Sequence, residues 1–259
     1  MLRGKCALVT GATGGLGYAI AERLAAEGCN VIVNGIVPDA EMTEPLARLA
    51  RHSVATRYLR ADLRDPNEIS AMMSAAAAAF GAVDILVNNA VVRHFAAVEE
   101  FPVERWNEAL AVNLSAAFHT IRLALPAMRS RGFGRIINMG SPYSFFAAAN
   151  RIDYVTTKTA ILGLTRTVAL ETAGTDITCN AVCPGTLPTP AIEGRIAKMA
   201  IERAISVDEA TRLYLADRQP GGRFIPLETV AALVAFLCGP ASREISGAAL
   251  PVDSAWTAS

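Results

Sequence analysis

The sequence is poor in the residues that build metal sites and disulfide frameworks. Its three histidines lie far apart in the chain, so no cluster of metal ligands is expected. Its five cysteines are an odd number, are scattered and include no C-x-x-C pair. This pattern is typical of reduced, buried thiols in a cytosolic protein. The residues concerned are His52, His94, His119, Cys6, Cys29, Cys179, Cys183 and Cys238.

Net charge and long apolar runs are also missing. Basic and acidic residues both number 24, which gives zero net charge and a pI near 6.8. Such a balance indicates no nucleic-acid or anionic-membrane surface. No uncharged apolar run reaches the roughly 18 residues of a membrane helix, and the nearest one, residues 69–83, carries serines. The first ten residues predict a short linker into a strand rather than a signal peptide. We therefore expect a cytoplasmic protein without nucleic-acid or membrane partners.

The chain does contain a regular alternation of apolar strands and amphipathic helices. Hydrophobic residues make up 52% and charged residues 19% of the sequence, which is ample for a large core. Strands that are apolar throughout and alternate with helices predict a parallel sheet covered on both faces. No repeat or low-complexity linker divides the chain, so one domain over residues 1–259 is expected. Strands are predicted at 5–10, 30–34, 54–59, 83–87, 134–139, 177–182 and 248–252, and helices at 18–27, 39–52, 67–80, 103–130 with a bend or end near Pro126, 153–173, 192–205, 207–217 and 227–237.

A glycine-rich turn joins the first predicted strand to the first helix. Residues 10–17 read TGATGGLG. Glycines let the backbone approach a pyrophosphate, and the following helix supplies free N–H groups and the positive end of its dipole. No Lys-Ser/Thr pair closes the turn, which excludes a P-loop. Strand, glycine turn and helix in this order predict a dinucleotide site, and a purely structural turn is the alternative.

Ser141, Tyr154 and Lys158 form a candidate catalytic group. Tyr154 and Lys158 are four residues apart, so on a helix they share a face, with Cβ atoms about 5–6 Å apart. An ammonium near a phenol favours the phenolate, so the phenol can exchange a proton with an alcohol or carbonyl oxygen. Ser141 follows the preceding strand and can donate a hydrogen bond to the same oxygen. A snorkelling lysine beside a half-buried tyrosine is the alternative for the pair alone.

These motifs together resemble the short-chain dehydrogenase/reductase family, and the match runs from end to end. Asn88-Asn89-Ala90 also fits, although Val91 stands where the family usually has glycine. The resemblance implies a Rossmann-type doubly wound parallel sheet of about seven strands. It further implies helices on both faces of that sheet and a small helical substrate lid at about 186–222.

The resemblance also implies the roles of individual residues. Tyr154 would be the acid/base, Lys158 would stabilise its phenolate and bind the nicotinamide ribose, and Ser141 would orient the substrate oxygen. Asn113 would complete the catalytic group by holding a water that relays protons to Lys158. The loop at Cys183-Pro184-Gly185 would lie beside the nicotinamide. The cofactor-binding residues would be Gly11, Thr13, Gly15, Leu16, Gly17, Asp62, Leu63, Asn89, Tyr154, Lys158, Pro184 and Gly185.

Within the family the chain is most similar to the bacterial D-3-hydroxybutyrate dehydrogenases, mainly in its second half. Those enzymes resemble one another in holding a carboxylate with glutamine, histidine, lysine and glutamine. Three arginines and a tyrosine stand at these positions here, and a pocket tryptophan is replaced by Thr186. An anionic substrate is therefore expected, although it need not be the same one. The expected substrate-binding residues are Arg93, Ser141, Tyr143, Arg151, Thr186, Arg195 and Trp256.

These observations predict an NAD-dependent dehydrogenase that interconverts a small hydroxy acid and its keto acid. A short-chain reductase of a bulkier or dianionic compound is the first alternative, and a non-catalytic dinucleotide-binding protein is the second. NAD is favoured over NADP because no lysine or arginine lies between Arg23 and Arg48, whereas Asp39, Glu41 and Glu44 follow the second strand. A homotetramer is expected from the resemblance, and no metal is expected.

Overall fold

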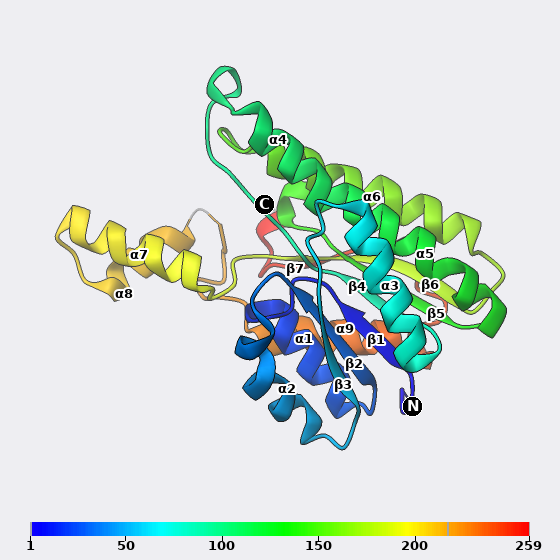
Figure 1. Cartoon of the computed structure of the whole chain (residues 1–259). Helices are drawn as coiled ribbons and strands as arrows, with labels where there is room; N and C mark the ends of the chain where they lie inside the picture. Colours follow the sequence, from blue (N-terminus) through cyan, green and yellow to red (C-terminus); the bar gives the residue numbers. More distant parts are fainter. Residues whose placement is uncertain (1, 217, 259) are drawn as a thin grey trace.

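The computed structural model describes residues 2–216 and 218–258, which are built around a sheet of seven strands (Figure 1). All neighbouring strands are parallel, and their order is β3-β2-β1-β4-β5-β6-β7. The chain crosses from β3, at one edge, back to β4 beside β1, so the sheet is doubly wound and the expected Rossmann-type fold is confirmed. The strands are β1 Cys6–Val9, β2 Asn30–Gly35, β3 Thr56–Arg60, β4 Ile85–Asn88, β5 Gly134–Met139, β6 Ile177–Pro184 and β7 Ala249–Val252.

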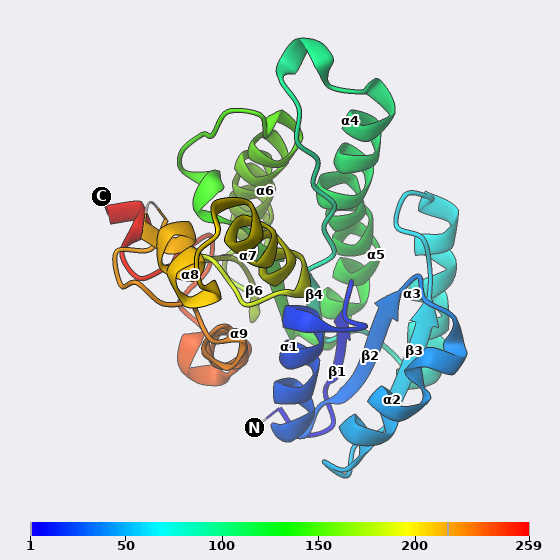
Figure 2. The ribbon, with the colours of Figure 1, turned by 90° about the vertical axis from the view of Figure 1, so that its left-hand side faces the viewer.

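Helices cover both faces of this sheet. One buried apolar cluster joins α1, α2 and α9 to the sheet, and a second joins α3, α5 and α6 to its other face (Figure 2). No helix in residues 2–216 and 218–258 is long and apolar enough to cross a bilayer. The helices are α1 Gly15–Ala26, α2 Thr43–Ala50, α3 Pro66–Phe80, α4 Val103–Leu110, α5 Ala116–Arg131, α6 Ile152–Glu171, α7 Pro190–Arg203, α8 Val207–Ala216 and α9 Leu227–Cys238, with short turns η1 Asp39–Met42, η2 Val98–Glu100, η3 Ala111–Ser115, η4 Pro142–Ser144, η5 Pro240–Ser242 and η6 Trp256–Ala258.

The long helix predicted at 103–130 is interrupted at a different place from the expected one. The α pattern gives way to a π turn at Ala111–Ser115, whereas α5 continues through Pro126 to Arg131. A proline removes one backbone hydrogen bond and strains a helix. Here the helix persists because Ala124 and Met128, on either side of the proline, are buried in the core. The helix was predicted to bend or end near Pro126; it does not end there, and the interruption of the α pattern lies around the buried Asn113.

Helices α7 and α8 project from the body of the molecule beside the carboxyl ends of the strands (Figure 1). They pack against each other through a small apolar cluster of their own, which includes Ile196, Tyr214 and Leu215. They fall within the segment that was expected to form a substrate lid. The last residue predicted for the second of these helices, Asp217, lies outside the described residues.

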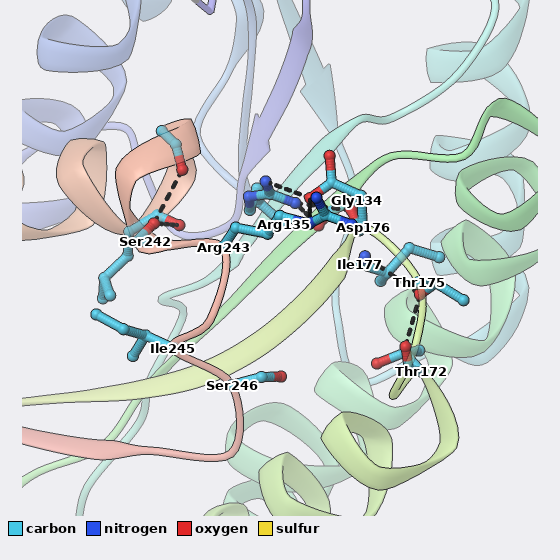
Figure 3. A network of polar contacts seen from close by, with 12 residues as sticks. Gly134, Arg135, Thr172, Thr175, Asp176, Ile177, Ser242, Arg243, Ile245 and Ser246 are labelled. Carbon is cyan, nitrogen blue, oxygen red and sulfur yellow. Dashed lines mark hydrogen bonds and ion pairs between the residues drawn. The ribbon is translucent and has the colours of Figure 1, made fainter.

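A buried arginine ties the amino ends of β5 and β6 together, at the edge of the sheet opposite the strand carboxyl ends (Figure 3). Arg135 is 1% exposed and its Nη2 lies 2.8 Å from Asp176 Oδ1. Its Nη1 donates to the carbonyl oxygens of Gly134 and Asp176, at 2.8 and 2.7 Å. Arg243 approaches the same carboxylate at 3.8 Å. Because this network is far along the strands from the glycine turn, we assign it to stability rather than chemistry.

Candidate active site

A cleft of about 510 Å³ lies at the carboxyl ends of the central strands. In doubly wound sheets this is where ligands bind, because the strand order reverses there and leaves a crevice. The glycine turn after β1 forms one wall. Gly11 has φ +59°, and a Cβ on it would lie 2.7 Å from Ala90 Cα. A Cβ on Gly17 would lie 2.5 Å from Asn89 Nδ2, so neither position accepts a larger residue without movement.

The amino end of α1 faces this cleft and suits the pyrophosphate of a dinucleotide. Gly14 caps the helix without any side-chain hydrogen bond, and the first turn carries no acidic residue. A Cβ on Gly14 or Gly15 would meet no atom within 4 Å, so the backbone there borders open space. Free N–H groups and the positive end of a helix dipole attract phosphate oxygens. The residues present therefore fit a nicotinamide dinucleotide.

Asn89 holds the glycine turn against the end of β4. Its Nδ2 donates to the carbonyl oxygens of Thr10 and Gly11, both at 2.9 Å. Thr10 Oγ1 in turn accepts from the backbone N–H groups of Asn89 and Ala90 at 3.0 and 3.1 Å. These bonds hold the glycine turn in place, and the Asn89 side chain also lines the cleft.

A cation lies at the end of β2, where the local sequence predicted none. Asn34 is 1% exposed, and its amide donates to Leu59 O and Ala61 O at 3.2 Å, so it is not free to bind a ribose. Asn34 and Gly35 line the cleft together with Ile36, whose side chain is 64% exposed. The β2–β3 register pairs Gly35 with Arg60, whose Nε donates to Ile36 O at 3.2 Å. Arg60 therefore brings a cation to the end of β2, although no lysine or arginine lies between Arg23 and Arg48 in the sequence.

Asp62 and Leu63 follow β3 and both line the cleft, as expected of adenine-binding positions. The Asp62 carboxylate is bound by Arg64, with Nη2 at 2.5 Å and Nε at 2.9 Å. These hydrogen bonds hold the pKa of Asp62 below its ordinary value. The Asp62 backbone N–H donates to Glu68 Oε2 at 2.7 Å. The loop is therefore fixed in place, and the carboxylate stays charged at neutral pH.

Lys158 is the most perturbed charged group of the cleft. It lies on α6, is 4% exposed, and its Nζ donates to Met139 O at 2.5 Å. Burial lowers the pKa of its ammonium to about 8, Cys183 opposes this shift and Arg93 adds to it. A buried amine with a pKa near neutrality is typical of functional sites.

Tyr154 lies close to that ammonium, and Ser141 lies two residues beyond Met139, whose carbonyl oxygen accepts a hydrogen bond from the ammonium. Tyr154 lines the cleft with Lys158, and the ammonium is 5.7 Å from the centre of its ring. Ser141 comes directly after β5 and Gly140, is 4% exposed, and its Oγ accepts from the Tyr143 N–H at 3.3 Å. The Tyr143 ring is 6.1 Å from the Tyr154 ring, edge to face. The helix thus places a phenol and an ammonium one turn apart, as their spacing predicted.

Asn113 occupies the π turn, and its side chain is fully engaged. Its Oδ1 accepts from Val92 N and its Nδ2 donates to Val92 O, both at 2.8 Å. Nδ2 also lies 3.2 Å from Thr157 Oγ1 on the catalytic helix. The amide therefore clamps the segment after β4 instead of standing free for a water, and the predicted water relay stays a prediction.

Four of the expected substrate-binding residues lie together around a set of aromatic rings: Tyr143, Arg151, Arg195 and Trp256. The Trp256 ring lies 5.5 Å from Tyr143 and 5.6 Å from Phe146. The guanidinium groups of Arg151 and Arg195 each lie 4.4 Å from the ring of Phe95.

Thr186 and Arg93, which are also expected to bind substrate, have different surroundings. Thr186 is 6% exposed, and its N–H donates to the Gln219 side chain, which in turn donates to Arg223 O. Arg93 lines the cleft itself, 5.9 Å from the Tyr154 ring.

The structure brings most predicted cofactor positions to one cleft. They are Gly11, Thr13, Leu16, Gly17, Asp62, Leu63, Asn89, Tyr154, Lys158, Pro184 and Gly185, with Gly15 beside them at the start of α1. Sequence reasoning missed Ile36, Arg64 and Phe95. Ile36 follows a strand end, which was a usable signal. Arg64 and Phe95 depend on spatial contacts that no local pattern announces.

Asp153 was missed as well, although it directly precedes the candidate tyrosine. It is fully buried, its Oδ2 accepts from His94 N at 3.0 Å, and its Oδ1 lies 2.6 Å from the Tyr154 backbone N. A carboxylate in the first turn of a helix is favoured by the dipole. Its contact with the segment at residue 94 could not be read from the sequence.

Comparison with known proteins agrees with this geometry. The family model described as short chain dehydrogenase matches residues 5–199. The chain is 44% identical to the D-beta-hydroxybutyrate dehydrogenase of Cupriavidus necator, covering 100% of both chains. It is 42% identical to the D-beta-hydroxybutyrate dehydrogenase of Rhizobium meliloti, covering 98% of this chain and 99% of the relative.

A solved structure extends the likeness to three dimensions. The L-sorbose reductase of Gluconobacter frateurii, complexed with NADPH and L-sorbose, superposes with a TM-score of 0.94 at 27% identity. The match covers 99% of this chain and 98% of the reductase. The chain therefore belongs to the short-chain dehydrogenase family and is an oxidoreductase that acts on CH–OH groups with a nicotinamide dinucleotide.

Proposed function

We propose that this protein is an NAD-dependent dehydrogenase that interconverts a small hydroxy acid and its keto acid, in the manner of a 3-hydroxybutyrate dehydrogenase. The observation that carries the proposal is the buried Lys158 ammonium beside Tyr154, in a glycine-walled cleft that Arg93 also lines. The two D-beta-hydroxybutyrate dehydrogenases at 44% and 42% identity support the substrate class. A non-catalytic binding protein would not need a phenol and an ammonium at this spacing.

The chain's own residues supply the proton chemistry. The Tyr154 phenolate takes the proton of the substrate hydroxyl, and Ser141 donates a hydrogen bond to the same oxygen and so orients it. The Lys158 ammonium, held by Met139 O, stabilises the phenolate electrostatically. A nicotinamide dinucleotide held by the residues of this cleft would supply the acceptor for the hydride of the carbinol carbon. Asn113 keeps the wall of the cleft in place through Val92.

The acid group of the substrate is recognised by arginine. Arg151 is half-buried at the amino end of α6, Arg93 lies near the Tyr154 ring, and Arg195 lies over the Phe95 ring that Arg151 also contacts. A guanidinium binds a carboxylate through two parallel hydrogen bonds, which are more directional than those of a glutamine amide. Three arginines also favour the alternative substrates, which are longer or dicarboxylic hydroxy acids, over 3-hydroxybutyrate itself.

NAD is the proposed cofactor. The apolar Ile36, at the end of β2, lines the cleft. Asp39 and Glu41 follow it, and they add to the effect of burial in raising the pKa of the nearby Tyr58. These acids disfavour the extra phosphate of NADP. Arg60 is the opposing cation, with its Nε occupied by Ile36 O. Measuring kcat/KM with NAD and with NADP under matched conditions tests the assignment, and a preference for NADP would contradict it.

The experiment that tests the mechanism is Tyr154→Phe. This variant keeps the ring and its packing on Tyr143 but lacks the proton. We expect NAD binding to stay close to wild type and turnover of hydroxy acids to fall by about 10² or more. Lys158→Ala should weaken both. Turnover near the wild-type rate in the phenylalanine variant would refute the proposed mechanism.

A further inference from the structure

The substrate side of the cleft carries more positive charge than one carboxylate balances. Arg93, Arg151 and Arg195 are all partly buried. Within the described part of the chain, no carboxylate oxygen lies within 4.0 Å of their guanidinium nitrogens. Partly desolvated cations without partners are costly, so groups of this kind persist where a ligand supplies the counter-charge.

Arg93 is built into the catalytic cleft. The backbone is fixed on both sides of it, at Val92 by the two 2.8 Å bonds with Asn113 and at His94 by the 3.0 Å bond to Asp153. Its guanidinium lies 5.9 Å from the Tyr154 ring and lines the same cleft as Lys158. A carboxylate that reaches Arg93 therefore sits close to the carbinol whose hydroxyl proton Tyr154 takes.

Arg151 and Arg195 are placed further out and act as a pair. Both guanidinium groups lie 4.4 Å from the centre of the Phe95 ring. Arg151 is also 5.2 Å from Tyr143, the ring that separates it from Tyr154. It lines a neighbouring cavity of about 570 Å³ together with Phe95, Tyr143 and Arg218. Burial lowers the pKa of Arg151, and Arg195 contributes to the shift, as expected for cations that repel each other without a bound anion.

We propose that the substrate carries two anionic groups: a carboxylate next to the carbinol, bound by Arg93, and a second anion several bonds away, bound jointly by Arg151 and Arg195. This inference rests on the proposed hydroxy-acid dehydrogenase function and names its substrate class. Each guanidinium lies over the Phe95 ring, and this cation–π contact limits the freedom of both side chains. A monoanion leaves one of the two sites without its counter-charge.

The test compares acids that differ in the distal group alone. 3-Hydroxyadipate and 3-hydroxyhexanoate have the same chain length, and the five- and seven-carbon pairs guard against a wrong spacing. We expect the wild type to prefer the best diacid over its matched monoacid by about tenfold or more in kcat/KM, the scale of a charge-assisted hydrogen bond. Arg151→Gln and Arg195→Gln should each reduce this preference toward unity. Arg93→Gln should lower kcat/KM for both acids by a similar factor.

Two controls keep the inference separate from folding and from the proposed function. Arg212→Gln removes one positive charge from an exposed position on α8 and should leave the preference as in wild type. Calorimetry with adipate and hexanoate measures recognition of the distal anion without turnover. If no hydroxy acid is oxidised, the proposed function fails, yet tighter binding of adipate that depends on Arg151 still supports the two-anion site. Equal treatment of diacid and monoacid, or a preference that survives both Arg151→Gln and Arg195→Gln, overturns it.

Discussion

The buried Lys158 ammonium should lower the free energy of unfolding at neutral pH, and the variant Lys158→Met tests this. The side chain is 4% exposed, and its ammonium donates to Met139 O at 2.5 Å. In residues 2–216 and 218–258 no carboxylate lies within ion-pair distance of it. Methionine keeps the length of the side chain and removes the charge. The variant separates the cost of burying a cation from the cost of losing packing.

The size of the effect follows from the shift of the lysine pKa from its ordinary 10.5 to about 8. At roughly 1.4 kcal/mol per pH unit, this corresponds to about 3 kcal/mol against the charged form. Below pH 8 the folded and unfolded chains both hold the proton, so the whole penalty is present. Between pH 8 and 10.5 the unfolded chain holds more protons, so stability rises with pH. Losing the bond to Met139 O costs the variant about 1 kcal/mol, which leaves a net gain of about 2 kcal/mol at pH 7.

Urea unfolding without cofactor, at pH 7 and pH 10 and at one protein concentration, measures this gain. Lys158→Met should be more stable than wild type at pH 7, and the difference should largely vanish by pH 10. Lys198→Met is the matched control, because the Lys198 side chain is 75% exposed and should show no such pH-dependent gap. A variant that is less stable than wild type at pH 7, or a gap that is the same at both pH values, would show that burying the ammonium does not control the stability at this position.

Three further predictions follow from other contacts. Asp153→Ala should raise KM for hydroxy acids by about tenfold with a smaller effect on kcat, because it frees the backbone beside Arg93. Asp153→Asn keeps an acceptor for the His94 N–H and should rescue much of the loss. Equal changes in kcat and KM would contradict this prediction. Asp176→Ala should lower the free energy of unfolding by about 3 kcal/mol or more while leaving KM unchanged, because it strands the buried Arg135. Light scattering at micromolar concentration should give a homotetramer, as the family resemblance implies, and a monomer peak would rule it out.

The fold was predictable because its signals are local and repeated. Predominantly apolar runs placed all seven strands, although the third and fifth contain Arg57 and Arg135, and the strand ends agree within about two residues, the usual uncertainty of such boundaries. The segment predicted as one helix at 39–52 forms the turn Asp39–Met42 followed directly by α2, and each part buries one residue in the core, Met42 and Leu49. The glycine turn was equally clear, because its neighbours in the sequence are also its neighbours in space.

The interruption of the long helix at Asn113 shows where local reasoning stops. Pro126 carries the stronger local signal, yet core packing holds α5 together through it. The π turn at Ala111–Ser115 has no such signal, because it is fixed by bonds from Asn113 to Val92 and Thr157 on two other segments. The same limit applies to Arg60, which reaches the end of β2 through strand register alone.

The amino end of α6 explains why the site depends on one helix more than on any single residue. Within two turns it presents Arg151 toward Phe95, Asp153 to the backbone at His94, Tyr154 to the cleft and Lys158 to Met139 O. A rotation of this helix would move the distal anion site, the clamp beside Arg93 and the proton-transfer pair together, since all four side chains share one backbone. Substrate recognition and proton transfer are therefore mechanically coupled, and substitutions that loosen the helix should affect KM and kcat at once.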